Sequence, residues 1–384
     1  MKWMWAKGMA LCLLVLFLSI HLGLIGVFAQ EEAVSMPESF DALSEALPDE
    51  VIDQIPDGML EGDVVQRADA LGQMLSPSYW MDLVNRALTE RVGAGLRQLA
   101  AISGILIFAA VFQTIRRSIS SEMLQNTVRF CTVGALFALL FEMQYEQLEG
   151  VIRFFDRLLA LMAGMVPVTG ALLAMGGNVS TAAQGSATLG VFLSVAEGVC
   201  AKTVLPVCAI TTAMALCQAL SPDLLLRGVA SALRKTYTFT LGFIMTLLCF
   251  LLSAQSTLCA AADSTGARTA KLLSSMAIPV VGSSVGETLR QVAGSVQYLK
   301  SIVGIGGIAF VLLLLLPTLL ALLVTRLVLL LGGGLAEMLG CEVESKLLSE
   351  LGSVWGTLIA VVAMCSVMFI FALSLFVRVA VAVG

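Results

Sequence analysis

The sequence predicts an all-α, polytopic membrane protein with about 6–8 transmembrane helices and a small helical extracytoplasmic domain near its N-terminus. Two observations lead to this fold class. Hydrophobic residues make up 58% of the 384 residues and charged residues only 13%, whereas soluble proteins contain about 45–50% and 25%. A chain with so few polar residues cannot cover a soluble surface, so its excess apolar surface must face lipid.

The second observation is an uneven distribution of charge. Residues 30–92 carry 14 acidic side chains against three arginines, a net −11 in a chain whose total is −5. Positive residues are retained in the cytoplasm during membrane insertion, so the acidic stretch is expected on the outer side. Nucleic-acid binding is disfavoured, because the acidic stretch repels phosphate and no basic cluster is interleaved with aromatic residues.

The first 29 residues have the pattern of a secretory signal peptide. Lys2 and Lys7 precede an apolar run, and small residues before position 30 predict cleavage after Ala29. The alternative is an uncleaved signal anchor, and in both cases the acidic stretch is exported. His21 is the only histidine and lies in this segment, so we expect no histidine ligand or base in the mature protein.

Residues 30–95 form the predicted acidic extracytoplasmic region. Three prolines between positions 37 and 56 exclude a long helix in its first half. Further on, Ser76 followed by Pro77 is a favourable pair for an N-cap and first helical position. We therefore expect a helix to begin there.

Residues 96–150 hold the first two predicted transmembrane helices. One runs from about Leu99 to Ile115 and ends at two arginines, 116 and 117, which the positive-inside rule places in the cytoplasm. The second runs from about Thr127 to Met143.

Residues 151–265 and 266–384 are predicted to be two membrane repeats. Val-Pro-Val-Thr-Gly at 166–170 recurs as Ile-Pro-Val-Val-Gly at 278–282, and a later Leu-Pro pair recurs at the same spacing. A clean final span ends each unit. This order suggests a gene duplication with the two copies packed about a pseudo-two-fold axis.

Prolines and glycines at matching positions of the repeats are the candidate functional helix breaks. Proline removes a backbone donor, and broken helices in corresponding halves often mark a pathway or binding site. The alternative is a kink used for close packing. The candidates are Pro167, Gly170, Pro279, Gly282, Pro206 and Pro317.

The second repeat leaves its topology open. Residues 283–300 look too polar to span, so we expect them at the membrane interface or in an external loop. Residues 302–331 predict either one kinked helix or a hairpin bent at Pro317, and this choice decides which side the C-terminus occupies. The glycines Gly304, Gly306 and Gly307 favour close helix packing over a pore lining.

Three charged residues interrupt apolar stretches and are candidate intramembrane polar groups: Glu197, Lys202 and Arg326. Such groups are functional candidates by default. The alternative, which we favour for Lys202 and Arg326, is that they reach the interface from the ends of shorter helices.

The sequence predicts no catalytic, cofactor-binding or metal site. It has no His-Glu-x-x-His motif and no Ser/His/Asp set. The nine cysteines show no Cys-x-x-Cys spacing, so neither zinc nor a disulfide framework is indicated.

Several motifs recur together in a recognisable order. They are the signal sequence, Ser-Pro-Ser-Tyr-Trp at 76–80, Arg-Thr-Ala-Lys at 268–271 before the 278–282 motif, and residues 299–307 leading to Pro317. In this order, along essentially the whole chain, the sequence resembles the stage III sporulation protein AE family of endospore-forming bacteria.

The resemblance implies a non-enzymatic component of the multi-protein channel that joins the mother cell to the engulfed forespore and is needed for late forespore gene expression. It implies a position in the mother cell's outer forespore membrane, with residues 30–95 between the two membranes. The implied partners are the lipid bilayer, other proteins of the stage III sporulation A operon, including a secretion-type ATPase and ring-forming proteins, and a forespore membrane channel protein across the intermembrane space.

Two other function classes stay open on the residues alone. A secondary transporter is the alternative, because the repeat and the candidate helix breaks fit one. It requires Glu197, Lys202 or Arg326 to face a central cavity. An intramembrane hydrolase would require a buried serine or a pair of aspartates.

Overall fold

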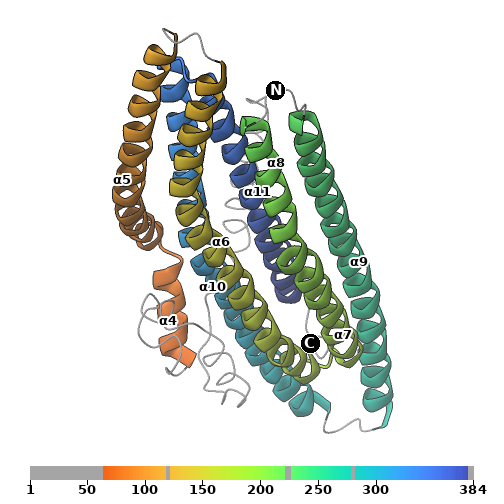
Figure 1. Cartoon of the computed structure of the whole chain (residues 1–384). Coiled ribbons are helices and arrows are strands. Elements are labelled where there is room, and N and C mark those ends of the chain that lie inside the picture. The colour runs from red at the N-terminus through yellow and green to blue at the C-terminus, as the bar shows by residue number, and fades with distance from the viewer. Residues whose placement is uncertain (1–63, 118–121, 221–225, 278–281, 379–384) are drawn as a thin grey trace. The chain divides into compact units, whose positions relative to one another are not determined.

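The computed structural model describes residues 64–117, 122–220, 226–277 and 282–378 (Figure 1). The predicted signal peptide, the acidic stretch up to residue 63 and Pro279 lie outside these residues.

Every element in the described ranges is a helix. Six helical segments are long and apolar enough to cross a membrane, which confirms an all-α polytopic protein. The elements are α4 (Val64–Met74), α5 (Pro77–Arg117), α6 (Glu122–Met175), α7 (Val179–Val195), the π-helix η2 (Ala196–Ala201), α8 (Lys202–Leu220), α9 (Leu226–Ala277), α10 (Gly282–Met338) and α11 (Glu342–Arg378). The segment α7–η2–α8 counts as one crossing, and α5, α6, α9, α10 and α11 are the others.

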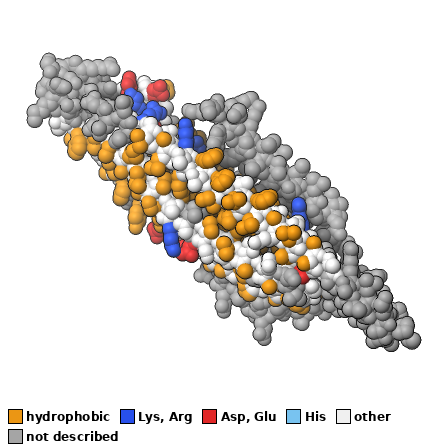
Figure 2. Space-filling model, turned by 90° about the vertical axis from the view of Figure 1, so that its right-hand side faces the viewer, with side chains coloured by type: hydrophobic (Ala, Val, Ile, Leu, Met, Phe, Trp, Pro, Cys, Tyr) orange, Lys and Arg blue, Asp and Glu red, His pale blue; other side chains and the backbone are white. Residues whose placement is uncertain are grey.

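Lipid-facing surface is most evident on α9. Phe239, Phe243 and Phe250 recur at intervals of four and seven residues, and their side chains are 75%, 61% and 70% exposed. Figure 2 shows hydrophobic side chains spread widely over the described surface on the side where α9 lies. Apolar surface of this extent on a helix of spanning length belongs against acyl chains.

The start of α5 follows the sequence prediction. The Ser76 hydroxyl accepts a hydrogen bond from the backbone N–H of Tyr79 at 3.3 Å and lies 2.7 Å from the carbonyl of Gln73. Pro77 is the first helical residue. From there α5 runs without interruption to Arg117, so no helix end marks the expected domain boundary near residue 95.

Two helices end through glycine in the left-handed conformation. Gly177 after α6 has φ of 77° and Gly340 after α10 has φ of 76°. In both cases the next residue's N–H bonds a carbonyl five residues back: Asn178 to Leu173 at 2.9 Å, and Cys341 to Ala336 at 2.8 Å. This double-bonded end satisfies carbonyls that would otherwise lack donors and turns the chain sharply into the next helix.

The packed core centres on α10 and α11, which share the most extensive helix–helix contact among the described elements. Glycines allow this close approach, as predicted for Gly304 and Gly307. A Cβ at Gly307 would lie 2.7 Å from Met165 of α6 and 3.2 Å from Leu373 of α11. A Cβ at Gly304 would overlap Val377, so both positions exclude larger side chains.

The prediction that proline breaks these helices is wrong at three positions. Pro167 lies inside α6, Pro206 inside α8 and Pro317 inside α10, and Gly170 is also helical. Packing of neighbouring helices holds such a helix together although one backbone bond is missing. Only the motif at 278–282 falls between helices, since α9 ends at Ala277 and α10 begins at Gly282.

The expectation for residues 283–300 is also wrong. They form the first part of α10, and residues 302–331 continue it as one helix. Lys300 is fully buried, with its Nζ 5.5 Å from the centroid of the Phe376 ring. An aromatic face stabilises a desolvated ammonium group, which explains why this polar stretch is not excluded from the bundle.

The single α10 helix also settles the side of the C-terminus. Six crossings are an even number, so the chain returns to the side of the membrane on which it began. The C-terminal end of α11 therefore lies on the same side as the start of α5.

The two proposed repeats agree only in outline. Each Leu-Pro pair lies inside a helix, α8 or α10, and a long final helix follows, α9 or α11. The first proline motif is helical, whereas the second lies between helices. The duplication and the domain boundaries stay predictions.

Candidate functional site

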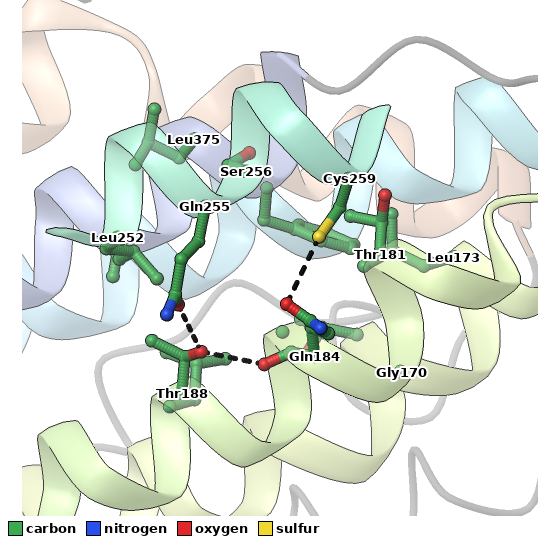
Figure 3. A pocket seen from close by; sticks show the side chains of 15 residues that line it. Gly170, Leu173, Thr181, Gln184, Thr188, Leu252, Gln255, Ser256, Cys259 and Leu375 are labelled. Atoms are coloured by element: carbon green, nitrogen blue, oxygen red, sulfur yellow. Dashed lines mark hydrogen bonds between the residues drawn. The ribbon is translucent and has the colours of Figure 1, made fainter. Parts of the chain in front are cut away.

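A polar cavity lies between α6, α7, α9 and α11 (Figure 3). Its volume is about 60 Å³, enough for a few water molecules. Leucines and Phe376 form part of its wall, and side chains with hydroxyl, amide and thiol groups form the rest. The polar lining residues are Thr169, Thr181, Gln184, Thr188, Gln255, Ser256 and Cys259.

Asp263 of α9 caps the beginning of α7. Its Oδ2 accepts the backbone N–H of Thr181 at 2.9 Å and the Thr181 hydroxyl at 2.6 Å, and both residues are buried. The first N–H groups of a helix have no partner within that helix. A carboxylate there satisfies one of them and interacts favourably with the helix dipole.

Two further pairs continue along the same helices. The Cys259 thiol donates to Gln184 Oε1 at 3.4 Å. The Thr188 hydroxyl lies 2.6 Å from Gln255 Oε1 and 2.8 Å from its own helix's Gln184 carbonyl, so one hydrogen is shared between two acceptors. We call the three pairs Thr181–Asp263, Gln184–Cys259 and Thr188–Gln255 the α7–α9 ladder.

The ladder follows from helical spacing. Positions 181, 184 and 188 lie on one face of α7, and positions 255, 259 and 263 lie on one face of α9, because residues three and four apart are neighbours on a helix. Interhelical hydrogen bonds of this kind hold membrane helices together where lipid supplies no hydrophobic driving force. Sequence reasoning missed this cluster, although the polar periodicity on each helix was available as a signal.

A buried ion cluster joins the start of α9 to α11. Glu350 Oε2 accepts from Arg234 at 2.7 Å, and Glu350 Oε1 accepts from Arg227 Nε at 2.7 Å. Arg234 and Glu350 are each 7% exposed, whereas the Arg227 side chain is 57% exposed. Arg234 and Glu350 therefore depend on each other for compensation, since a buried charge without a partner is strongly unfavourable.

The candidate charged residues of the sequence stand elsewhere. Glu197 and Lys202 bond each other at 2.8 Å with side chains 53% and 69% exposed. The Arg326 guanidinium packs on Gly356 of α11, where a Cβ would lie 3.1 Å from its central carbon. None of the three lines the cavity described above, so their positions give the transporter alternative no support.

The chemistry of the cavity favours binding or helix contact over catalysis. Its one adjacent carboxylate, Asp263, is occupied by two hydrogen bonds from Thr181. Within the described ranges no group of three or more histidine, cysteine, aspartate or glutamate side chains is arranged to hold a metal ion.

Comparisons with known proteins agree with the resemblance. A family model described as Stage III sporulation protein AE matches residues 62–380, a range that contains every described helix. Stage III sporulation protein AE of Bacillus subtilis (strain 168) is 22% identical over 238 residues, which is 61% of this chain. The match covers 59% of that relative's length. No solved structure matches the chain.

Proposed function

The chain belongs to the stage III sporulation protein AE family, and from this premise we propose that it is a non-enzymatic, multi-pass component of a channel complex linking mother cell and forespore. The family match carries the proposal, because it includes all six membrane-spanning segments. A role in sporulation follows from membership itself, and the channel role is the proposal.

The bonding of the polar side chains supports a structural function. Asp263, Glu350 and Arg234 each bond a neighbouring helix, so these groups are used to hold the bundle together. A hydrolase would instead need an activated nucleophile and a base within hydrogen-bond reach of it.

The proposed location is the mother cell's outer forespore membrane, with residues 30–95 in the space between the two membranes. There the acidic stretch would bind a basic surface of a partner through charge complementarity. Products of the same operon and a forespore membrane channel protein are the proposed partners.

Deletion of the gene tests this proposal. We expect normal vegetative growth, normal engulfment and loss of late forespore-specific reporter expression, restored by a wild-type copy at another locus. The same strain carrying a copy that lacks the coding region for α11 controls for effects of the inserted DNA. Normal spore formation combined with a growth or uptake defect would contradict the proposal and favour a transporter.

A further inference from the structure

The crossing formed by α7, η2 and α8 contains one π-helical turn, Ala196–Ala201, in an otherwise α-helical segment. The Lys202 backbone N–H donates to the carbonyl of Glu197, five residues back. Pro206 lies four residues further on and cannot donate to the Lys202 carbonyl. The α-helical bonding pattern is therefore already weakened at this turn, and a π turn forms most readily where that pattern is interrupted.

The same two residues that share the π backbone bond also share an ion pair, Lys202 Nζ to Glu197 Oε1 at 2.8 Å. Residues five apart in an α-helix are rotated by about 140° around the axis and do not meet. The wider π turn brings them onto one face. The ion pair therefore stabilises the π turn relative to an α-helical alternative.

Loss of the π turn would change which face α7 presents. A π turn holds one residue more than an α turn, so its conversion advances α7 by one residue, a rotation of about 100°. Ala182, Gly185 and Leu189 would then occupy the positions of the ladder residues Thr181, Gln184 and Thr188. Each polar side chain of α7 in the ladder would be replaced by an apolar one.

We propose that the Glu197–Lys202 pair is a latch on a register switch in α7, which holds the polar α7–α9 ladder against α9 while the π turn persists. Release of the latch converts the turn to α-helix and presents the apolar register to α9, which closes the polar cavity. This inference depends only on the geometry of α7, η2 and α9, and it is independent of the role in sporulation.

Native Cys259 provides a reporter of the register. In the present register its thiol faces Gln184, so Gln184→Cys is placed to form a disulfide with it. In the advanced register Gly185→Cys takes that place, and a Cβ at Gly185 meets nothing within 4 Å. Both single-cysteine variants of the full-length chain are oxidised in native membranes, and the linked peptides are quantified by mass spectrometry.

Charge variants then shift the ratio of the two crosslinks. With the native ion pair, the crosslink from position 184 should dominate. Glu197→Gln and, separately, Lys202→Gln should each lower the ratio of the 184 crosslink to the 185 crosslink by about two- to fivefold, the range that an exposed ion pair supports. The double variant E197K/K202E, which reverses the pair, should restore the ratio.

A second contact distinguishes a register change from loosening of the bundle. Thr203 of α8 and Tyr237 of α9 lie 2.9 Å apart on the other side of the π turn. A crosslink through T203C/Y237C should keep its native yield in every charge variant. Unchanged 184 and 185 yields in the neutral variants, failure of the reversed pair to restore the ratio, or an equal loss of the T203C/Y237C crosslink would each overturn the switch.

Discussion

Replacement of Glu350 by alanine tests the largest electrostatic contact in the bundle. Glu350 bonds both Arg227 and Arg234, and Arg234 is 7% exposed. Removal of the carboxylate leaves the Arg234 guanidinium desolvated beside α11 without its counter-charge. Breaking a buried pair in this way costs about 3–5 kcal/mol.

The matched control is Arg227→Ala, which removes the exposed partner of the same carboxylate. That side chain is 57% exposed, so solvent screens it and its loss costs about 0.2–1 kcal/mol. Replacement of both buried partners, as R234M/E350L, removes the charge and its counter-charge together. Such double replacements by apolar residues of similar volume are often neutral or stabilising.

The free energy of unfolding of the full-length protein, measured by SDS titration in mild detergent, gives the comparison. We expect E350A to lose several times more stability than R227A, with R234M/E350L close to the native protein. An E350A variant no less stable than R227A would show that Arg234 is hydrated or compensated elsewhere, and would refute the assignment of a buried pair.

Three further predictions concern single positions. Gly304→Ala should lower stability through overlap with α11, by about 1–3 kcal/mol, whereas Gly134→Ala, with nothing within 4 Å, should not; equal SDS midpoints would contradict the packing. Asp263→Asn should cost about 1 kcal/mol at the start of α7, which hydrogen exchange of the first α7 amides would report as lost protection. Burial and, secondarily, the Glu344 carboxylate raise the pKa of the Cys341 thiol, so the thiolate is scarce at pH 8. Iodoacetamide labelling of Cys341 should therefore rise with pH beyond the usual thiol range, and faster labelling in E344Q would support the cause, whereas an unchanged rate would contradict it.

The fold class could be predicted from the sequence because lipid imposes it. Excess apolar residues must face acyl chains, and only helices or closed barrels satisfy the backbone there. The Ser76 cap and the close packing at Gly304 were also predictable, because each depends on a local property of one residue. Such features need no knowledge of which helices are neighbours.

The proline breaks and the fate of Lys300 show where sequence reasoning fails. Whether Pro167 ends a helix depends on the packing around α6, which the sequence does not state. Lys300 is tolerated inside the bundle because Phe376 lies beside it, 76 residues later in the chain. Both outcomes depend on contacts between distant segments.

The candidate site was missed for the same reason. The polar periodicity of α7 and that of α9 are each weak when read alone, since Thr188 or Gln255 on a single helix suggests only a polar position. Together they form the ladder, but only once the two helices are known to be adjacent. By contrast, Glu197 and Lys202 were conspicuous in the sequence, yet their pairing requires a π turn that composition does not predict.

The distribution of contacts explains why α7 is the helix able to change register. Helices α10 and α11 interlock through glycines such as Gly307, where a Cβ would collide with side chains of two helices, so a shift there forfeits apolar packing over many residues. The middle of α9 exposes Phe243 and its neighbours, and α9 is joined to α7 and α11 by polar bonds near its two ends. A one-residue shift of α7 therefore exchanges a few hydrogen bonds for apolar contacts and leaves the α10–α11 core intact. The energy difference between the two registers is then small enough for one exposed ion pair to decide it.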